Sequence, residues 1–233
     1  MRDHRILLIT VIALLAGCKR HPQPEYFPLD AGAHWEYRLH EVNPLVDGKR
    51  ALTMDNLGPR DREGRRYWLR RSSEGNEYWL SADGAVQRVA QRNWLAPDPT
   101  FDKSAQTVLP AKLEVGVEWD ATTRPYILER AIPFRERFWG DESKSVELRM
   151  RLAALDDTVQ TPAGRFDHCL RVEGQGLLYV LADARYAASE VPVTQTEWYA
   201  PGIGLVKLHR VEALRTEQIV GGEVTMELTR FEP

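Results

Sequence analysis

The chain has 233 residues and is nearly balanced in charge, with 31 Lys and Arg against 34 Asp and Glu and a net charge of −3. Proteins that bind nucleic acid usually carry a basic face, so this balance argues against nucleic acid as a partner. A chain of this length can also bury a sizeable core without disulfide bridges.

The N-terminus has the pattern of a secretory signal. Arg2 and Arg5 make a basic start, and an apolar run of ten residues follows at 6–15. This run is too short to cross a hydrocarbon core about 30 Å thick, which needs about 20 residues in a helix. A short apolar run between a basic start and small residues is typical of a secretory signal peptide.

The run ends in Leu15-Ala16-Gly17-Cys18, which resembles the lipobox of bacterial lipoproteins. In that family the Cys sulfur receives a diacylglycerol, the peptide is cut before the Cys, and the new amine receives a further acyl chain such as palmitate. The resemblance implies a signal peptide over residues 1–17, cleavage between Gly17 and Cys18, and lipidation of Cys18. The alternatives are an ordinary signal peptide or a buried apolar helix in which the Cys occurs by chance.

The residues after the lipobox predict where the protein is anchored. Lys19 stands where enteric lipoproteins of the inner membrane carry aspartate, so the resemblance favours the periplasmic face of the outer membrane. Residues 18–25 comprise the lipidated Cys and a polar segment with two prolines, which predicts a membrane tether. Its last seven residues reach at most about 25 Å. Residues 26–233 are then expected to form a single β-rich periplasmic domain.

Cys169 is the second of the two cysteines. If Cys18 carries lipid, Cys169 has no intramolecular partner in an oxidising compartment. It is then either a buried thiol or half of an intermolecular bridge. Free cysteine is among the most buried residue types, which favours the buried thiol.

Several stretches alternate apolar and polar residues in the manner of β-strands. The clearest cover residues 35–40, 146–152 and 223–228. A period of two indicates a sheet with one buried and one wet face. Gly and Pro signals predict turns between strands at Gly221-Gly222, residues 81–84 and residues 43–48.

Three further stretches are less regular. Residues 95–111 and 121–145 hold several prolines and are expected to be long loops, which often line binding sites. Residues 177–189 have the alanines of a helix together with aromatic and β-branched residues, so helix and strand both stay open.

A short motif occurs twice. Leu29-x-x-Gly32-x-x-Trp35 is repeated as Leu113-x-x-Gly116-x-x-Trp119, and each copy precedes or opens a predicted strand. Glycine allows a tight turn that places the Trp on the sheet beside the Leu. The repeat indicates two similar strand starts, which arise from an old duplication or by coincidence.

Three longer motifs together resemble a group of uncharacterised bacterial envelope lipoproteins. They are Tyr26-Phe27-Pro28-Leu29-x-x-Gly32-x-x-Trp35-x-Tyr37, Thr161-Pro162-Ala163-Gly164-x-Phe166-Asp167-x-Cys169-Leu170-x-Val172 and Trp198-Tyr199-Ala200-Pro201-Gly202-Ile203-Gly204-Leu205-Val206-Lys207. The resemblance covers most of the chain after residue 25. It implies an all-β fold with a curved antiparallel sheet, similar to the half-barrels of lipoprotein-localisation factors.

The sequence carries no clear catalytic or metal-binding pattern. His168 and Cys169 are neighbours in a predicted strand, so their side chains lie on opposite faces and cannot share an ion. The other histidines lack the spacing of paired metal ligands, and there is no Gly-x-Ser-x-Gly nucleophile motif. We expect no catalytic residue, no metal and no cofactor.

Seven tryptophans and eight tyrosines provide material either for the core or for a concave face that binds lipid, glycan or peptide. Tryptophans in sheet proteins mostly fill the core, which favours the first use. The candidates for ligand-facing positions are Trp68, Trp79, Trp94, Trp139 and Trp198.

We predict a non-catalytic lipoprotein, anchored to the membrane, that binds a hydrophobic ligand or an envelope component such as a lipid, a glycan or an envelope protein. The alternative is a structural or interaction subunit of an envelope assembly, and the third reading is a hydrolase with an unrecognised site. An apolar concavity would favour ligand binding, and an exposed edge strand with apolar side chains would favour the assembly. A cluster of carboxylates or histidines with shifted pKa values would favour the hydrolase.

Overall fold

The computed structural model describes residues 26–132, 134–138, 145–181 and 188–233. The predicted signal peptide, the cleavage site at Gly17, the lipidation site Cys18 and the tether lie outside these residues, as does Trp139. No helix in the described part of the chain is long and apolar enough to span a membrane.

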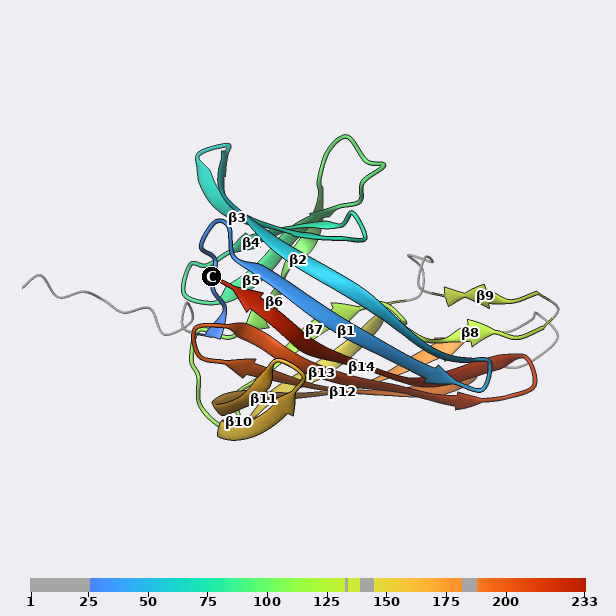
Figure 1. The fold of residues 1–233 in the computed structure, drawn as a ribbon. Helices are drawn as coiled ribbons and strands as arrows, with labels where there is room; N and C mark the ends of the chain where they lie inside the picture. Colours follow the sequence, from blue (N-terminus) through green and yellow to red (C-terminus); the bar gives the residue numbers. More distant parts are fainter. Residues whose placement is uncertain (1–25, 133, 139–144, 182–187) are drawn as a thin grey trace, which may run out of the picture.

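The described chain is all-β, as predicted (Figure 1). Fourteen strands form one antiparallel sheet, and none of the described segments adds a helix to it. The strands are β1 (His34–Asn43), β2 (Val46–Arg62), β3 (Arg65–Ser72), β4 (Glu77–Ser81), β5 (Val86–Arg92), β6 (Thr100–Leu109), β7 (Glu118–Thr123), β8 (Glu129–Arg130), β9 (Glu136–Arg137), β10 (Val146–Thr161), β11 (Gly164–Val180), β12 (Ser189–Ala200), β13 (Gly204–Arg215) and β14 (Ile219–Glu232).

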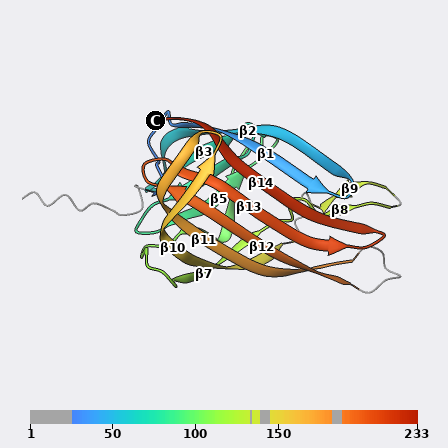
Figure 2. The same cartoon turned by 60° about the horizontal axis from the view of Figure 1, so that its bottom comes forward.

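The strands follow one another as two meanders joined side by side. Their order is β6-β5-β4-β3-β2-β1-β14-β13-β12-β11-β10-β7, and the short strands β8 and β9 pair with each other beside β14. The strands from β1 through β14 to β10 run next to one another across the face seen in Figure 2. Apart from β8 and β9, strands that follow one another along the chain are neighbours, so the turns alternate between the two ends of the sheet.

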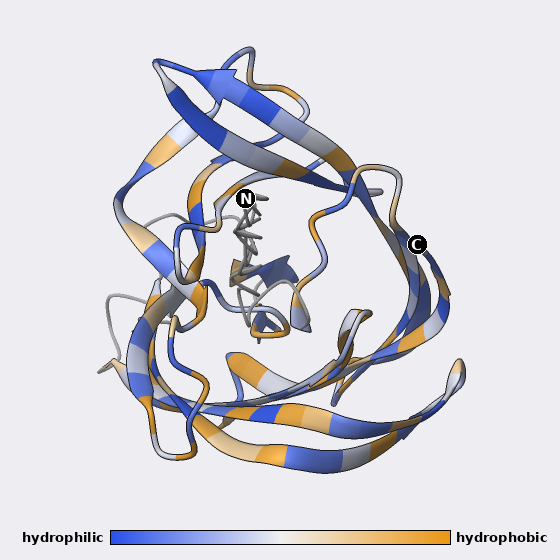
Figure 3. Ribbon diagram, turned by 90° about the vertical axis from the view of Figure 1, so that its left-hand side faces the viewer, coloured by the Kyte–Doolittle hydropathy of each residue, from blue (hydrophilic) through white to orange (hydrophobic). Residues whose placement is uncertain are grey.

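The sheet curves until its two edge strands meet (Figure 3). The indole N–H of Trp119 in β7 donates to the carbonyl of Thr107 in β6 at 3.1 Å, and the backbone N–H of Thr122 donates to Gln106 Oε1 at 2.9 Å. The predicted curved antiparallel sheet is confirmed. Its curvature exceeds that of a half-barrel and gives a nearly closed barrel.

The repeated Leu-x-x-Gly-x-x-Trp motif opens each half of the barrel. Gly32 and Gly116 have φ angles of 95° and 92°, in the region that favours glycine. The indole N–H of Trp35 then donates to the carbonyl of Ile203, and that of Trp119 to the carbonyl of Thr107 in the neighbouring strand. After each copy the chain forms six consecutive neighbours in the sheet, β1–β6 in one half and β7 with β10–β14 in the other. The two similar strand starts are confirmed, and the matching halves favour duplication over coincidence.

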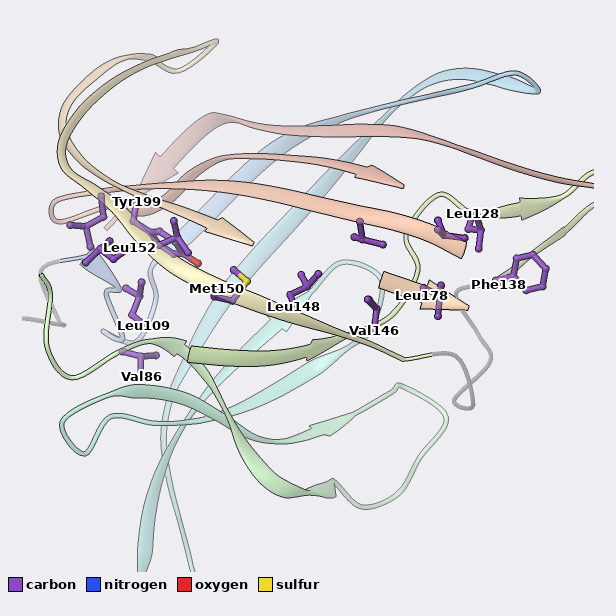
Figure 4. Packing of buried hydrophobic residues seen from close by; sticks show 14 of the residues in the cluster. Val86, Leu109, Leu128, Phe138, Val146, Leu148, Met150, Leu152, Leu178 and Tyr199 are labelled. Carbon is purple, nitrogen blue, oxygen red and sulfur yellow. The ribbon is translucent and has the colours of Figure 1, made fainter. Parts of the chain in front are cut away.

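Two clusters of buried apolar side chains fill the barrel. The larger follows β10, β11 and β12 along the barrel and meets β4–β6. Val86 and Leu109 lie beside Leu152 at one end of it, and Leu128 and Phe138 lie near its other end (Figure 4). The smaller cluster lies on β1, β2, β13 and β14 and includes the fully buried Trp35.

The three motifs of the resemblance meet at one end of the barrel, which we call the motif end. The indole N–H of Trp35 donates to the carbonyl of Ile203 at 2.7 Å. The hydroxyl of Tyr26 donates to the carbonyl of His168 at 3.3 Å. These contacts join the start of the described chain to the β12–β13 turn and to β11, so the motifs have a structural role here.

Arg70 of β3 is held inside the motif end. Its guanidinium carbon lies 4.2 Å from the ring centre of Phe27 and 4.4 Å from that of Trp35. It donates to the carbonyl of Pro28 at 2.8 Å and to Asn56 Oδ1 at 2.9 Å. Burial lowers the pKa of Arg70 to about 10. The first motif therefore supplies two aromatic faces and a carbonyl to one buried cation.

The predicted turn at Gly221-Gly222 is wrong. Both glycines lie inside β14, and the chain turns at residues 216–218 instead. A Cβ on Gly221 would collide with the carbonyl of Glu212, and one on Gly222 would collide with the carbonyl of Val42. Glycine is required here because neighbouring backbones approach closely, and not because the chain reverses.

The other two predicted turns are found, one of them shortened. Residues 81–84 connect β4 to β5, with Gly84 at a φ of 84°. Between β1 and β2 only Pro44 and Leu45 lie outside the strands, and the side chain of Asn43 accepts the N–H of Leu45 at 2.7 Å. Pairing of the strands extends into the region expected to be loop.

The predicted long loops are partly strand. Most of 95–111 is β6, and 121–145 includes the end of β7 together with β8 and β9. Prolines bound these strands rather than interrupt them, as edge strands allow. Of the stretch 177–189, residues 177–180 complete β11, which settles that part as strand, and 182–187 lie outside the described residues.

Candidate functional site

A cavity of about 630 Å³ lies inside the barrel, and it is partly open to solvent. This volume is typical of sites for small organic molecules. It is lined by β1, β2, β13 and β14 on one side and by the β3–β4 region and the segment after β7 on the other. The turns among these elements lie at the end opposite the motif end, because successive turns of a meander alternate.

One wall of the cavity is apolar. These side chains face the inside of the barrel, and all but Val224 belong to the smaller core cluster or pack against it. They are Leu39, Leu52, Met54, Leu205, Leu208, Val224 and Met226.

The facing wall is polar and comes from β3, β4, β5 and the turn between β3 and β4. It carries Ser72, Glu74, Asn76, Tyr78 and Gln91. Burial raises the pKa of the Tyr78 phenol to about 12, so this group stays protonated. No hydrogen bond joins its hydroxyl to another residue of the described chain.

Residues 124–128, which we call the segment after β7, cross the barrel interior and are held there by Glu212 of β13. Its carboxylate accepts the backbone N–H groups of Tyr126, Ile127 and Leu128 at 2.6, 3.1 and 2.9 Å. Glu212 also accepts Arg210 Nε at 2.8 Å, and neither side chain of this pair has exposed surface. The segment therefore separates the cavity from the larger core cluster.

Arg210 completes this polar core. It donates to Gln195 Oε1 at 2.8 Å and to the carbonyl of Arg124 at 2.9 Å. Its guanidinium carbon lies 4.2 Å from the ring centre of Tyr126. A buried charge is tolerated only where it is paired and hydrogen-bonded, and Arg210 meets both conditions.

Charged side chains at the mouth of the cavity pair with one another. Glu41 accepts Arg50 Nε at 3.3 Å and Arg137 Nη2 at 2.7 Å. Arg50 also contacts Glu74. Burial raises the pKa of Glu41, but its bonds to the two arginines outweigh this and hold the pKa below its ordinary value. Glu41 therefore stays ionised.

Glu197 of β12 lines the cavity more deeply. Its carboxyl oxygens accept Gln195 Nε2 at 2.5 Å and the hydroxyl of Tyr199 at 2.6 Å. Burial raises the pKa of Glu197, and these hydrogen bonds offset the rise only in part. The group is thus held towards its neutral form beside the apolar wall.

None of the four candidate tryptophans that the structure describes is among the residues lining the cavity. Trp68 packs against the larger core cluster and Trp198 against the smaller one. Trp79 belongs to an aromatic cluster on β3, β4 and β6. Trp94 is 74% exposed beyond the end of β5. The cavity is lined instead by aliphatic side chains and tyrosines.

The sequence reasoning missed Glu197, Arg210 and Glu212. A signal for the last two was present, since they continue the same alternating positions as the buried Val206 and Leu208 of β13. A charged residue in phase with the buried face of a strand indicates an internal ion pair.

The histidines do not gather at the cavity. His34, His40, His168 and His209 each lie beside a carboxylate on the outer surface. Within the described residues, no group of three or more His, Cys, Asp and Glu side chains is placed to hold a metal ion. Glu197 is the one described carboxyl group whose pKa is clearly raised.

Cys169 lies in β11 without exposed surface. Its Sγ lies 3.6 Å from the carbonyl of Phe166, and burial raises the pKa of the thiol to about 11. The thiolate, which is the reactive form, is therefore disfavoured. This environment favours the buried-thiol reading over an intermolecular bridge.

The sequence matches no protein-family model and no curated protein. Two solved structures are similar to the chain. A protein from Bacteroides fragilis, described as exported and as having a YmcC-like fold, is 13% identical, with a TM-score of 0.46, over 89% of this chain and 99% of that one. A protein from Parabacteroides distasonis, described as a lipoprotein, is 11% identical, with a TM-score of 0.45, over 89% and 98% of the two chains. At such low identity the similarity concerns the course of the chain and not the chemistry of a site.

Proposed function

We propose that this chain is a non-catalytic lipoprotein of the bacterial envelope that holds a small hydrophobic or amphipathic molecule inside its barrel. The cavity of about 630 Å³, with an apolar wall facing a polar one, is the observation that supports this. Such a site buries the apolar part of a ligand, which is the main source of affinity, and places a few polar groups to orient it.

The proposed lipid anchor on Cys18 would orient the barrel, and with it the cavity, relative to the membrane. The described chain begins at Tyr26, at the motif end, and a tether from Cys18 reaches at most about 25 Å. An anchor on Cys18 therefore keeps the motif end towards the membrane. The β1–β2, β3–β4 and β13–β14 turns beside the cavity lie at the other end, and we propose that the ligand enters there, from the periplasm and not from the bilayer below.

A fluorescence titration tests this function. The full-length chain with Cys18→Ser, which carries no acyl chains of its own, is titrated with the uncharged probe N-phenyl-1-naphthylamine. Met226→Trp fills the cavity and should abolish saturable binding, whereas Thr225→Trp, on the other face of β14, should leave it unchanged. Equal saturable binding by both variants would show that the probe does not use the cavity.

An interaction subunit is the second candidate, and one observation favours it. Large apolar side chains are exposed on the turns and strand ends opposite the motif end, and they include Leu45, Trp94, Leu95, Phe134, Tyr179 and Leu181. Exposed apolar groups gathered at one end of a protein are typical of contact sites. The edge strands favour this candidate less, because β6 and β7 face each other.

Crosslinking distinguishes the two candidates. A photoreactive residue at position 181 would capture a defined envelope protein if this end docks a partner. The same residue at position 115, near the motif end, serves as the control. If neither position yields a specific adduct, the interaction reading loses its support.

A further inference from the structure

The cavity has several charged groups, but they lie at its mouth and are paired. Glu41 bonds Arg50 and Arg137, and Arg50 also reaches Glu74. Arg124 lies beside them and is also engaged within the chain. An anionic ligand would have to compete with carboxylates already bound to these arginines.

Three other polar groups that line the cavity are neutral. The hydroxyl of Tyr78 and the side-chain amides of Asn76 and Gln91 line it, and none of the three makes a side-chain hydrogen bond to another described residue. All three side chains are half-buried and line the space that a ligand would occupy. They provide hydrogen-bond donors and acceptors without net charge.

Glu197 adds a carboxyl group to the lining of the cavity. Each of its carboxyl oxygens already accepts a hydrogen bond, from Gln195 or from Tyr199. Glu197 lines the cavity, and burial raises its pKa towards the protonated form, in which the carboxyl group can also donate a hydrogen bond. A neutral ligand oxygen can accept this hydrogen, whereas an ion brought next to the apolar wall would lose its hydration without gaining a counter-charge.

The buried ion pair does not change this balance. Arg210 and Glu212 neutralise each other, and their remaining groups are bonded to the segment after β7 and to Gln195. Apart from the paired charges, the cavity therefore combines an aliphatic wall with the uncharged hydrogen-bonding groups of Asn76, Tyr78 and Gln91. This is the complement of a molecule with an aliphatic body and hydroxyl or carbonyl oxygens.

We propose, building on the function proposed above, that the ligand is an uncharged amphiphile, with an aliphatic chain in contact with Leu52, Leu208 and Met226 and a hydroxylated headgroup hydrogen-bonded to Tyr78 and Glu197. Acylglycerols and alkyl glycosides belong to this class. Free fatty acids and alkyl phosphates, which have the same chains with an anionic headgroup, are discriminated against.

The test compares headgroups on one chain length. Isothermal titration calorimetry at neutral pH measures binding of 1-decanoylglycerol, decanoate and decyl phosphate to the full-length Cys18→Ser chain, below the concentrations at which each forms micelles. We expect 1-decanoylglycerol to bind at least about tenfold more tightly than either anion, because the anions lose hydration without gaining a partner. Equal or tighter binding of an anion would overturn this inference while leaving the proposed ligand-binding function intact. Absence of binding by all three would count against the proposed function itself.

A variant pair tests the role of the polar wall. Tyr78→Phe removes one hydroxyl from the cavity and should weaken binding of 1-decanoylglycerol about tenfold with little effect on decanoate, since the headgroup loses a hydrogen-bond partner. Tyr179→Phe removes an exposed hydroxyl on β11 and is the matched control. Unchanged affinity of the Tyr78→Phe chain for 1-decanoylglycerol would contradict the assigned headgroup contact.

Discussion

Glu197 and Trp35 illustrate the two kinds of inner-face residue in this barrel. Glu197 is a carboxyl group enclosed among hydrogen-bond donors beside aliphatic side chains. The ring of Trp35 packs against the buried guanidinium of Arg70, and its indole N–H donates to the carbonyl of Ile203. Because the pKa of Glu197 is shifted, this residue makes the free energy of unfolding depend on pH. Trp35 contributes to the free energy of unfolding through the packing of its ring.

Replacement of Glu197 by Gln should stabilise the protein as pH rises. The pKa of Glu197 is raised above the ordinary value of 4.5, mainly by burial, so the folded state binds this proton more tightly than the unfolded chain does. Its contribution to the free energy of unfolding is complete below about pH 4.5 and is lost as pH rises through the folded-state pKa.

Thermal melts of the wild type and the Glu197→Gln variant between pH 4 and pH 8 measure this effect. The melting midpoint of the variant minus that of the wild type should increase from pH 4 to pH 8, because glutamine cannot ionise. Glu190→Gln, on an exposed part of the same strand, is the control. A difference between Glu197→Gln and wild type that stays constant with pH would contradict the assignment.

Trp35→Ala should lower the free energy of unfolding by about 3–5 kcal/mol, the usual cost of deleting a large buried ring. The ring is 1% exposed and packs against Arg70 and Phe231. Trp94→Ala, which removes the same side chain where it is 74% exposed, should change stability by at most about 0.5 kcal/mol. Urea unfolding measures both, and similar values for the two variants would contradict the core role of Trp35.

The segment after β7 is the element on which the cavity depends most. Three of its backbone N–H groups are bound by one carboxylate, Glu212, and its course separates the cavity from the larger core. Local stability of such a segment follows from these few bonds. A change at Glu212 therefore tests whether the segment is held as described.

Glu212→Gln should accelerate hydrogen exchange at Tyr126, Ile127 and Leu128 and lower the free energy of unfolding by about 3–5 kcal/mol, because Arg210 is left buried without its counter-charge. Glu223→Gln, which changes a half-exposed carboxylate of the next strand, should leave exchange in this segment unaltered. Hydrogen-exchange mass spectrometry measures both variants. Unchanged protection of residues 126–128 in Glu212→Gln would contradict the model of a carboxylate-bound segment.

The strands themselves were largely predictable, and the site was not. Alternation places β1, β10 and β14 correctly because one face of each is buried and the other is wet. The strand β6 escaped prediction because it is an edge strand that is exposed over much of its length. The Gly221-Gly222 turn failed because close approach of two strands and reversal of the chain both select glycine.

The charged residues inside the barrel depend on contacts that no local pattern reveals. Arg70 meets Phe27 only because the start of the chain folds into the barrel, and Glu212 meets residues 126–128 across more than 80 positions. Counting tryptophans did not identify the lining of this cavity, since aromatic rings fill cores as readily as they line sites, and core filling was the favoured use. The more informative signal was that Arg210 and Glu212 occupy the same alternating positions of β13 as the buried Val206 and Leu208, which indicates charged groups inside the barrel.

The whole molecule has two different ends. The motif end joins the start of the described chain to the β12–β13 turn and β11, and the opposite end holds the cavity mouth and most of the exposed apolar side chains. The two six-stranded halves meet along β1–β14 and, through side chains, along β6–β7. A lipid anchor at Cys18 would hold the molecule by its motif end.

Replacement of Cys18 by Ser should leave an unlipidated and uncleaved precursor. The thioether forms only on the cysteine sulfur, and in the family that the lipobox resembles, cleavage follows lipidation. Membrane fractionation with mass measurement of the protein reads out both steps. Normal cleavage at Gly17 and retention in the outer membrane of the variant would overturn the lipoprotein assignment.

Native mass spectrometry of the mature protein, extracted from the membrane under gentle conditions, tests the central claim most directly. Occupation of the cavity predicts an added mass in the range of a lipid or glycolipid, beyond that of the acyl chains on Cys18, and this mass should be absent from Met226→Trp and present in Thr225→Trp. A bare lipidated monomer, or an added mass that persists when the cavity is filled, would contradict the claim that the barrel interior holds a ligand.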